Sequence, residues 1–201
     1  AEAITIPVTI KTRIGIDDHD DYEFLREFVS TLADAGCQTF YVHARKAILQ
    51  GLSPKQNRDV PPLRYDIALR LKREFPELEI VLNGGLRTVA DVRRHLADFD
   101  GVMIGREAYN NPYVLALIEN DLFDTPLPAR DNVVASYLPY VKAQLRDGVR
   151  LQSMTRHIQG LYAGEPGARC WRRTLSEGGA DRSAGVEVIE RAHAARLAAA
   201  A

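Results

Sequence analysis

Polar and glycine-rich groups follow four short apolar runs in the first half of this sequence. In chain order they are Lys11, His43, Asn83, Gly84, Gly85, Gly105 and Arg106. Glycines let a backbone approach a ligand closely, and an arginine offers a fork of donors to a phosphate. The two glycine turns with Arg106 therefore predict an anion site, and the most complete unit around them runs from Ile80 to Arg106.

Each of these signals has an ordinary explanation when it is taken singly. Gly84-Gly85 could be only a tight turn, Arg106 and Lys11 could be surface cations, and His43 could be a structural histidine. Four successive strands with such ends are harder to explain in this way, because the carboxyl ends of parallel strands share one edge of a sheet, where ligands bind. The combination suits flavin mononucleotide (FMN): a lysine for the charge on the reduced ring, a histidine donor, and glycine loops with an arginine for the phosphate.

The elements that position these groups alternate between strand and helix. Strands are predicted at 6–11, 39–43, 80–82 and 102–104, helices at 22–35, 66–75, 89–99 and 113–123, and a long loop at 47–62. Thr88 is the predicted N-cap of the third helix. Strict alternation is typical of a parallel sheet, and the strand spacing of about 20–40 residues suits the βα repeats of a (β/α)8 TIM barrel.

After the linker Thr125–Pro128 the strand pattern stops and only helical patterns remain. We predict helices at 132–147, 151–162 and 168–176 and from 187 to the end, with Asp131 as an N-cap and a kink or late start at Pro139. The sequence thus predicts an α/β domain at 1–123, followed by a small all-α helical bundle domain at 124–201.

Charge and composition narrow the classes of partner. Residues 1–123 hold 15 Lys+Arg against 19 Asp+Glu, whereas residues 124–201 hold 11 against 8, with the excess between Lys142 and Arg173. A locally basic face favours a phosphate-bearing polymer over a membrane. Cys37 and Cys170 form no CxxC pair, so we predict no disulfide framework and no metal site, and we expect a reducing cytoplasm.

Long motifs in this order resemble the tRNA-dihydrouridine synthase family, closest to its A subfamily. They are VTIKTRIGIDD, HARKAILQGLSPKQNRDVPPL, NGGL, GVMIGREAYNNP and TRHIQGLYAGEPGARCWRRTLSE. The resemblance implies reduction of a tRNA uridine to 5,6-dihydrouridine in the D-loop, near position 20/20a. It also implies FMN as the cofactor and NADPH as the reductant.

The resemblance assigns roles to the matching positions. Lys11 and His43 would contact the flavin ring, and Asn83, Gly84, Gly85, Gly105 and Arg106 would bind its ribityl and phosphate portion. Lys55 and Arg58 in the long loop, and Arg169 and Arg172 in the tail, would contact tRNA. Trp171, between the two tail arginines, is predicted as a core residue.

One departure from the family pattern is large. The family's catalytic cysteine lies in an Asn-x-Gly-Cys-Pro motif, which this sequence does not contain, and neither Cys37 nor Cys170 follows a predicted strand. We therefore expect a fragment that holds the second half of the barrel and the helical tRNA-binding domain, and that is inactive and association-prone without the first half. The alternatives are a non-catalytic RNA-binding fragment and another FMN barrel such as a dihydroorotate dehydrogenase, which would not need the basic tail.

Overall fold

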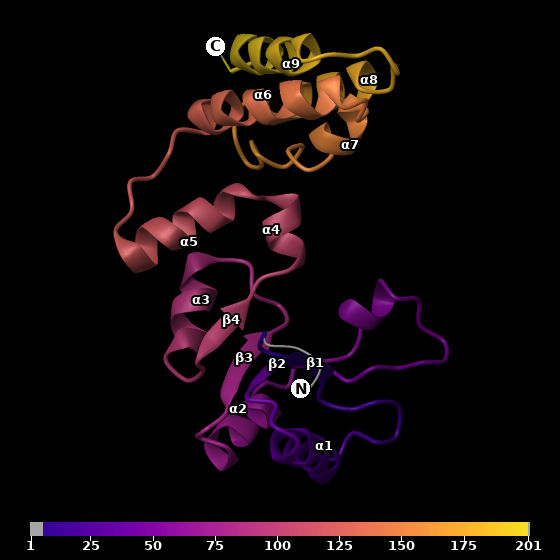
Figure 1. The fold of residues 1–201 in the computed structure, drawn as a ribbon, viewed down its shortest axis with the longest axis vertical. Helices are drawn as coiled ribbons and strands as arrows, with labels where there is room; N and C mark the ends of the chain where they lie inside the picture. Colours follow the sequence, from indigo (N-terminus) through magenta and orange to yellow (C-terminus); the bar gives the residue numbers. More distant parts are fainter. Residues whose placement is uncertain (1–5, 201) are drawn as a thin grey trace. The chain divides into compact units, whose positions relative to one another are not determined.

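The computed structural model describes residues 6–200, and the chain divides into two compact units (Figure 1). The first unit ends at Gly105 and the second begins at Arg106. This division falls before the predicted domain boundary at 123/124, because α4 (Arg106–Asn110) and α5 (Tyr113–Phe123) group with the later helices. The assignment of 1–123 and 124–201 to two functional domains stays a prediction.

The first unit is an α/β fold with a parallel four-stranded sheet. Its elements are β1 (Thr9–Arg13), α1 (Tyr22–Asp34), β2 (Thr39–His43), the short 3-10 helix η1 (Gln56–Arg58), α2 (Tyr65–Glu74), β3 (Glu79–Asn83), α3 (Val89–Leu96) and β4 (Gly101–Met103). The strands lie in the order β1-β2-β3-β4, and each neighbouring pair is parallel. The predicted alternation of strands and helices is confirmed.

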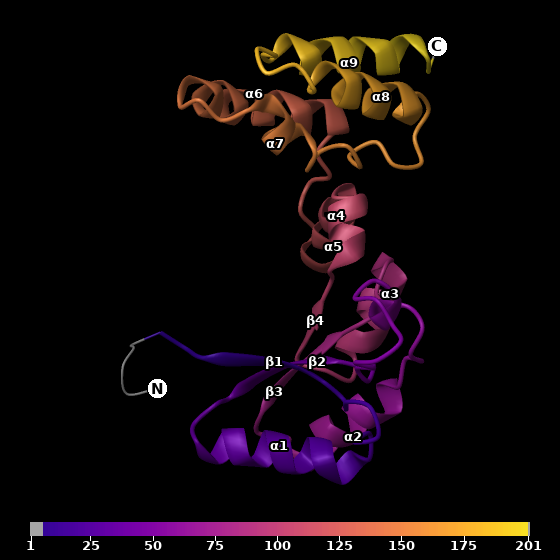
Figure 2. The ribbon, with the colours of Figure 1, turned by 90° about the vertical axis from the view of Figure 1, so that its right-hand side faces the viewer.

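The two faces of this sheet differ in what covers them. Phe40 and Val42 of β2 and Ile80 and Leu82 of β3 are fully buried in one core with the apolar sides of α1 and α2. Figure 2 shows α1 and α2 on the same side of the sheet. Since side chains alternate along a strand, the intervening residues project from the opposite face.

Local sequence explains where the helices begin. Asp21 caps α1 by accepting a hydrogen bond from the Phe24 backbone N–H at 2.8 Å. Thr88, the predicted cap of α3, forms a reciprocal capping box with Asp91. These caps fix the helix starts that bring the chain back to each following strand.

The second unit is built of helices in the described residues. After α4 and α5 come α6 (Arg130–Arg146), α7 (Leu151–Thr155), α8 (Ala168–Gly178) and α9 (Glu187–Ala198). Their core centres on Trp171 and Tyr162, both 0% exposed, whose rings meet edge to face at 5.0 Å. The prediction that Trp171 is a core residue is confirmed. Within residues 6–200, no helix combines the length and apolar character needed to cross a bilayer.

Two expectations about this unit are wrong in detail, and a third is wrong in part. The predicted helix 151–162 ends at Thr155, because Ile158, Leu161 and Tyr162 pack inward from a chain of turns instead of from one helical face. Pro139 lies inside α6 and does not delay its start, whereas the alternative effect, a kink, stays a prediction. Asp131 lies in the first turn of α6, whose N-cap is Ala129.

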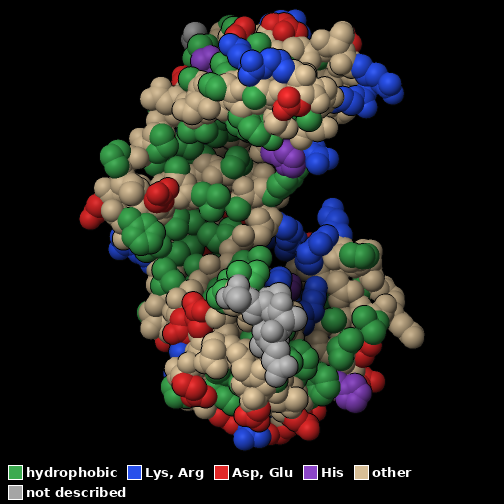
Figure 3. Space-filling model, viewed as in Figure 1, with side chains coloured by type: hydrophobic (Ala, Val, Ile, Leu, Met, Phe, Trp, Pro, Cys, Tyr) green, Lys and Arg blue, Asp and Glu red, His purple; other side chains and the backbone are tan. Residues whose placement is uncertain are grey.

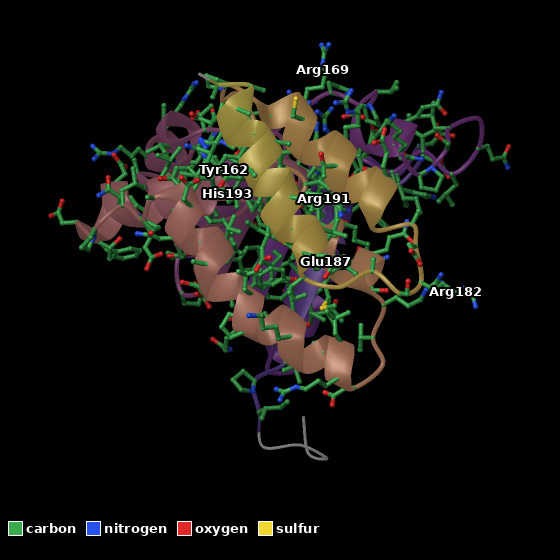
Figure 4. All side chains as sticks on the ribbon, turned by 90° about the horizontal axis from the view of Figure 1, so that it is seen from above. Tyr162, Arg169, Arg182, Glu187, Arg191 and His193 are labelled. Atoms are coloured by element: carbon green, nitrogen blue, oxygen red, sulfur yellow. The ribbon has the colours of Figure 1, made fainter. Side chains whose placement is uncertain are left out.

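The Asp131 carboxylate joins three parts of the second unit. Its Oδ1 accepts a hydrogen bond from the Tyr162 hydroxyl at 2.6 Å and lies 3.0 Å from Nε2 of His193 in α9. Figure 4 shows Tyr162 and His193 on the same side of α9. The hydrogen bond from Tyr162, followed by that from His193, holds the pKa of Asp131 below its usual range.

We expect Asp131→Asn to lower the free energy of unfolding by about 1 kcal/mol at pH 7, a value reduced for the partial exposure of the carboxylate. A carboxyl group with a depressed folded pKa stabilises above its unfolded pKa of about 3.9 and loses that contribution as the pH falls through the folded value. Urea unfolding at pH 7 and below pH 4 measures this difference. Asp147→Asn, at the other end of α6, is the matched control; an equal loss in both variants would contradict the role of Asp131.

Candidate functional site

Lys11, His43 and Asn83 meet near the carboxyl edge of the sheet face that α1 and α2 leave uncovered. Register pairs Lys11 with Tyr41 and His43 with Asn83. The Lys11 Nζ donates to Asn83 Oδ1 at 2.7 Å, and Asn83 Nδ2 donates to the Met103 carbonyl at 2.8 Å. Hydrogen bonds therefore connect β1 to β3 and β3 to β4 at one place, and His43 of β2 lies in register with Asn83.

Lys11 occupies a different position in its strand from the one expected. The predicted strand ends at this residue, but β1 continues to Arg13. Lys11 therefore lies two residues before the carboxyl end of β1. Its long side chain extends far enough to bond to Asn83, the last residue of β3. Partial burial, with a smaller effect of Arg13, lowers the pKa of Lys11.

Gly84 and Gly85 are required by the packing of the protein itself. Both have positive φ, +118° and +75°. A Cβ at Gly84 would lie 2.8 Å from His43 Cδ2, and one at Gly85 would lie 2.6 Å from Leu63 Cδ1. The Tyr65 hydroxyl also donates to the Gly84 carbonyl at 2.8 Å. A side chain at either position would therefore collide with its neighbours, and at Gly84 the nearest neighbour is the His43 ring.

Gly105 differs from the other two glycines. A Cβ built on it meets nothing within 4 Å, and its φ is not in the left-handed region. Its backbone is therefore open to approach by a ligand. Arg106 follows it in the chain and is the first residue of α4, a short helix that sequence reasoning missed.

A cluster of three arginines lies beside these groups in the first unit. Burial lowers the pKa of Arg13, and the nearby Arg45 and Arg58 lower it further. Arg13 Nη1 donates to the Lys46 and Asn57 carbonyls, both at 2.8 Å. Arg45 Nη1 donates to the carbonyls of two residues further along the same loop, Asp59 and Pro61.

These bonds fasten the long loop 47–62 to β1 and to the end of β2. Sequence reasoning missed Arg13 and Arg45, although each stands two residues after a predicted site residue and so faces the same way on an extended chain. The loop presents Lys55 and Arg58, both exposed, around η1. Figure 3 shows Lys and Arg side chains gathered beside this loop.

Arg169 and Arg172 lie on the exposed side of α8. Trp171 and Leu175 fill the buried side of the same helix, which leaves the arginines in solvent. Arg169 projects away from the helix (Figure 4). Glu165, a candidate acidic partner for these arginines, instead pairs with Arg130 at 2.9 Å.

Cys37 lies away from the carboxyl edge of the sheet, and Cys170 belongs to the second unit. Cys37 is buried between the end of α1 and the start of β2, and Cys170 lies within α8. No group of three or more His, Cys, Asp or Glu residues in the described part of the chain is arranged to hold a metal ion.

Comparison with known proteins identifies the family. The family model for dihydrouridine synthase (Dus) matches residues 1–199, and the chain belongs to this family. It is 51% identical over 192 residues to the tRNA-dihydrouridine(20/20a) synthase of Vibrio cholerae serotype O1, covering 94% of this chain and 59% of that protein. It is 53% identical over 194 residues to the enzyme of the same name from Yersinia pestis, covering 95% of this chain and 56% of the relative.

A third relative gives the same result over a shorter match. The tRNA-dihydrouridine(20/20a) synthase of Pseudomonas syringae pv. tomato is 54% identical over 177 residues, covering 87% of this chain and 53% of the relative. The chain thus spans between half and two thirds of the length of these curated relatives.

Proposed function

We propose that this chain takes part in the FMN-dependent reduction of uridine to 5,6-dihydrouridine in the D-loop of tRNA, at position 20/20a, with NADPH as the reductant in the cytoplasm. Membership of the dihydrouridine synthase family supports the reaction class, and the names of the relatives support the tRNA substrate and its position. The observation that carries the proposal is the Lys11–Asn83 pair on the uncovered sheet face, with His43 beside it.

The residues of this face fit a flavin. Lys11 would supply a cation for the negative charge that develops on the flavin ring, and His43, whose ring packs against Gly84, would contact the flavin ring. Asn83, Gly84, Gly85, Gly105 and Arg106 would hold the ribityl and phosphate portion, and the space around Gly105 is open to such a ligand. When bound, FMN would supply the hydride that reduces the C5–C6 bond of the uracil ring.

The sheet supports assignment to the last four βα units of a TIM barrel. Consecutive parallel strands in the order β1-β2-β3-β4 have no reversal of order, whereas a doubly wound sheet reverses at its switch point. With α1 and α2 on one side, the other face carries Lys11, Arg13, Tyr41, His43 and Asn83 and would line the barrel interior.

The tRNA would be bound by cations from both units. Lys55 and Arg58 on the fastened loop and Arg169 and Arg172 on α8 are exposed. Arginines on a rigid element pair well with phosphates. Residues 124–201 are proposed as the helical tRNA-binding domain.

A second candidate, a non-catalytic RNA-binding role for this chain, rests on the cysteines. The proposed reaction needs a proton donor at C5 of the uracil, and the family resemblance assigns that role to a cysteine in a motif that this sequence lacks. Cys37 lies at the amino end of β2, the edge opposite His43. We therefore expect that this chain alone binds flavin and tRNA but forms no dihydrouridine.

FMN titration followed by flavin fluorescence, and mass spectrometry of tRNA after incubation with FMN and NADPH, test the proposal. Lys11→Met keeps the length of the side chain and removes its charge, so FMN should bind about tenfold more weakly. Lys72→Met, which removes a lysine paired with Asp100 elsewhere in the first unit, is the control. FMN affinity that is equal in wild type and Lys11→Met would overturn the flavin assignment, and dihydrouridine made by this chain alone would overturn the expected inactivity.

A further inference from the structure

The second unit contains a polar pocket that none of the assignments above uses. It has a volume of about 330 Å³ and lies between α7, the turns that follow α7, and α8. Its lining residues are Gln152, Ser153, Thr155, Arg156, Gln159, Leu175 and Ser176. A volume of this size is at the lower end of small-molecule sites and suits one nucleoside.

Polar side chains make up most of the pocket lining. Leu175 and Thr155 are each 1% exposed at the bottom of the pocket, and the Thr155 hydroxyl is bonded to the Leu151 carbonyl at 3.3 Å. Gln152 and Ser176 are exposed at the rim. A ring with polar edges matches this arrangement, because its edges can reach the exposed polar side chains of the rim.

Helix packing holds the two walls close together. At the end of α8, a Cβ built on Gly179 would lie in ordinary contact with α7, 3.5 Å from Thr155 Oγ1 and 3.8 Å from Gln152 Cα. Across the pocket, Gln159 Nε2 donates to Ser176 Oγ at 3.2 Å. The rim side chains are thus positioned before any ligand arrives.

The chemistry of the rim favours a nucleobase and its phosphate. Amide and hydroxyl groups carry both donors and acceptors, which is the capacity needed to read a base edge. Arg156 adds a cation, and no acidic residue lines the pocket. Arg172 lies one helical turn before Ser176 on α8, so the basic side of α8 continues towards the pocket.

We propose that this pocket binds one unstacked nucleotide of the RNA substrate, with Gln152, Gln159 and Ser176 on the base edge and Arg156 on the phosphate. The proposal rests on the tRNA-binding role proposed above and adds a base-reading subsite to it. Unpaired loop nucleotides are the part of an RNA whose base edges a protein can read, whereas a duplex offers mainly phosphates and 2′-hydroxyls.

The test compares the binding of an unmodified tRNA transcript and of a fully paired RNA duplex by fluorescence anisotropy, with the full chain. Gln159→Ala/Ser176→Ala should weaken tRNA binding about tenfold, leave duplex binding unchanged, and leave the slope of log K against log salt unchanged, because no charge is lost. Arg156→Ala should weaken tRNA binding and lower that slope by about one.

Two further variants make the result specific. Ser176→Met fills the pocket without changing charge and should weaken tRNA binding at least as much as the double alanine variant. Gln144→Ala removes the same kind of side chain from α6, outside the pocket, and should bind as wild type does. Circular dichroism confirms that each variant is folded.

The possible failures are distinguishable. Wild-type tRNA affinity in both the double alanine and the Ser176→Met variants would overturn the pocket while leaving the tRNA-binding role standing. An equal loss for tRNA and duplex would also overturn it, because a base-reading pocket requires an unpaired nucleotide. Failure of the wild-type chain to bind tRNA at all would overturn the proposed function itself.

Discussion

Arg169→Ala/Arg172→Ala should bind tRNA roughly 50-fold more weakly than wild type at 0.1 M salt. Each phosphate contact that is lost reduces the magnitude of the slope of log K against log salt by about 0.9. Two lost contacts therefore lower the binding constant by nearly two powers of ten at this salt concentration. The arginines lie on the exposed side of α8, opposite the buried Trp171, so their removal should leave the core intact.

Binding measured across a salt series gives both the affinity and the slope of log K against log salt. The magnitude of this slope should decrease by about two. Arg73→Ala/Arg94→Ala removes the same charge from exposed positions on α2 and α3 and is the matched control. A slope that does not change, or one that falls equally in the control, would show that α8 makes no specific phosphate contacts.

Gly84→Ala should lower the free energy of unfolding of the first unit by about 3 kcal/mol. Two costs combine: a non-glycine residue at positive φ, worth about 1–3 kcal/mol, and a Cβ at 2.8 Å from the His43 ring and 3.0 Å from Leu63. Relief of the contact must move His43, so flavin affinity should fall along with stability.

Gly105→Ala is the matched partner of this variant. Its Cβ enters open space, so stability should stay within about 0.5 kcal/mol of wild type. If the flavin phosphate approaches this backbone, the added methyl group should still weaken FMN binding. Thermal unfolding and FMN titration of both variants separate a glycine needed for packing from one needed for a ligand; unchanged FMN affinity in Gly105→Ala would contradict the phosphate assignment.

Much of the first unit could be predicted from local patterns. Short apolar runs bounded by turn residues gave β2 and β3 within one residue at each end, and Thr88 was identified as a cap because its side chain acts within its own helix turn. Patterns of this kind need no distant partner. The end of β1 was missed, because Arg13 is held by the Lys46 and Asn57 carbonyls, which lie far along the chain.

The second unit was harder to predict for the same reason. Apolar residues after Thr155 have helical spacing, yet Gly160 packs against the backbone of Asn110, where a Cβ would lie 1.9 Å from the carbonyl oxygen. That contact favours turns over a continuous helix. Asp131 resembles a cap in the sequence, but Tyr162 and His193 bind its carboxylate.

The sequence by itself determined the residue types at the candidate site and the alternation that brings strand ends to one edge. It also determined the family, because long motifs occur in the same order. Only the tertiary structure decided that Lys11 bonds to Asn83, that Gly84 is fixed by His43 and Leu63, and that Gly105 is open. Strand register and side-chain packing join residues far apart in the chain, and local spacing carries no information about them. The two glycine turns of the anion site first indicated by Ile80–Arg106 therefore differ. Gly84 and Gly85 are needed for packing within the protein, whereas Gly105 is open to a ligand.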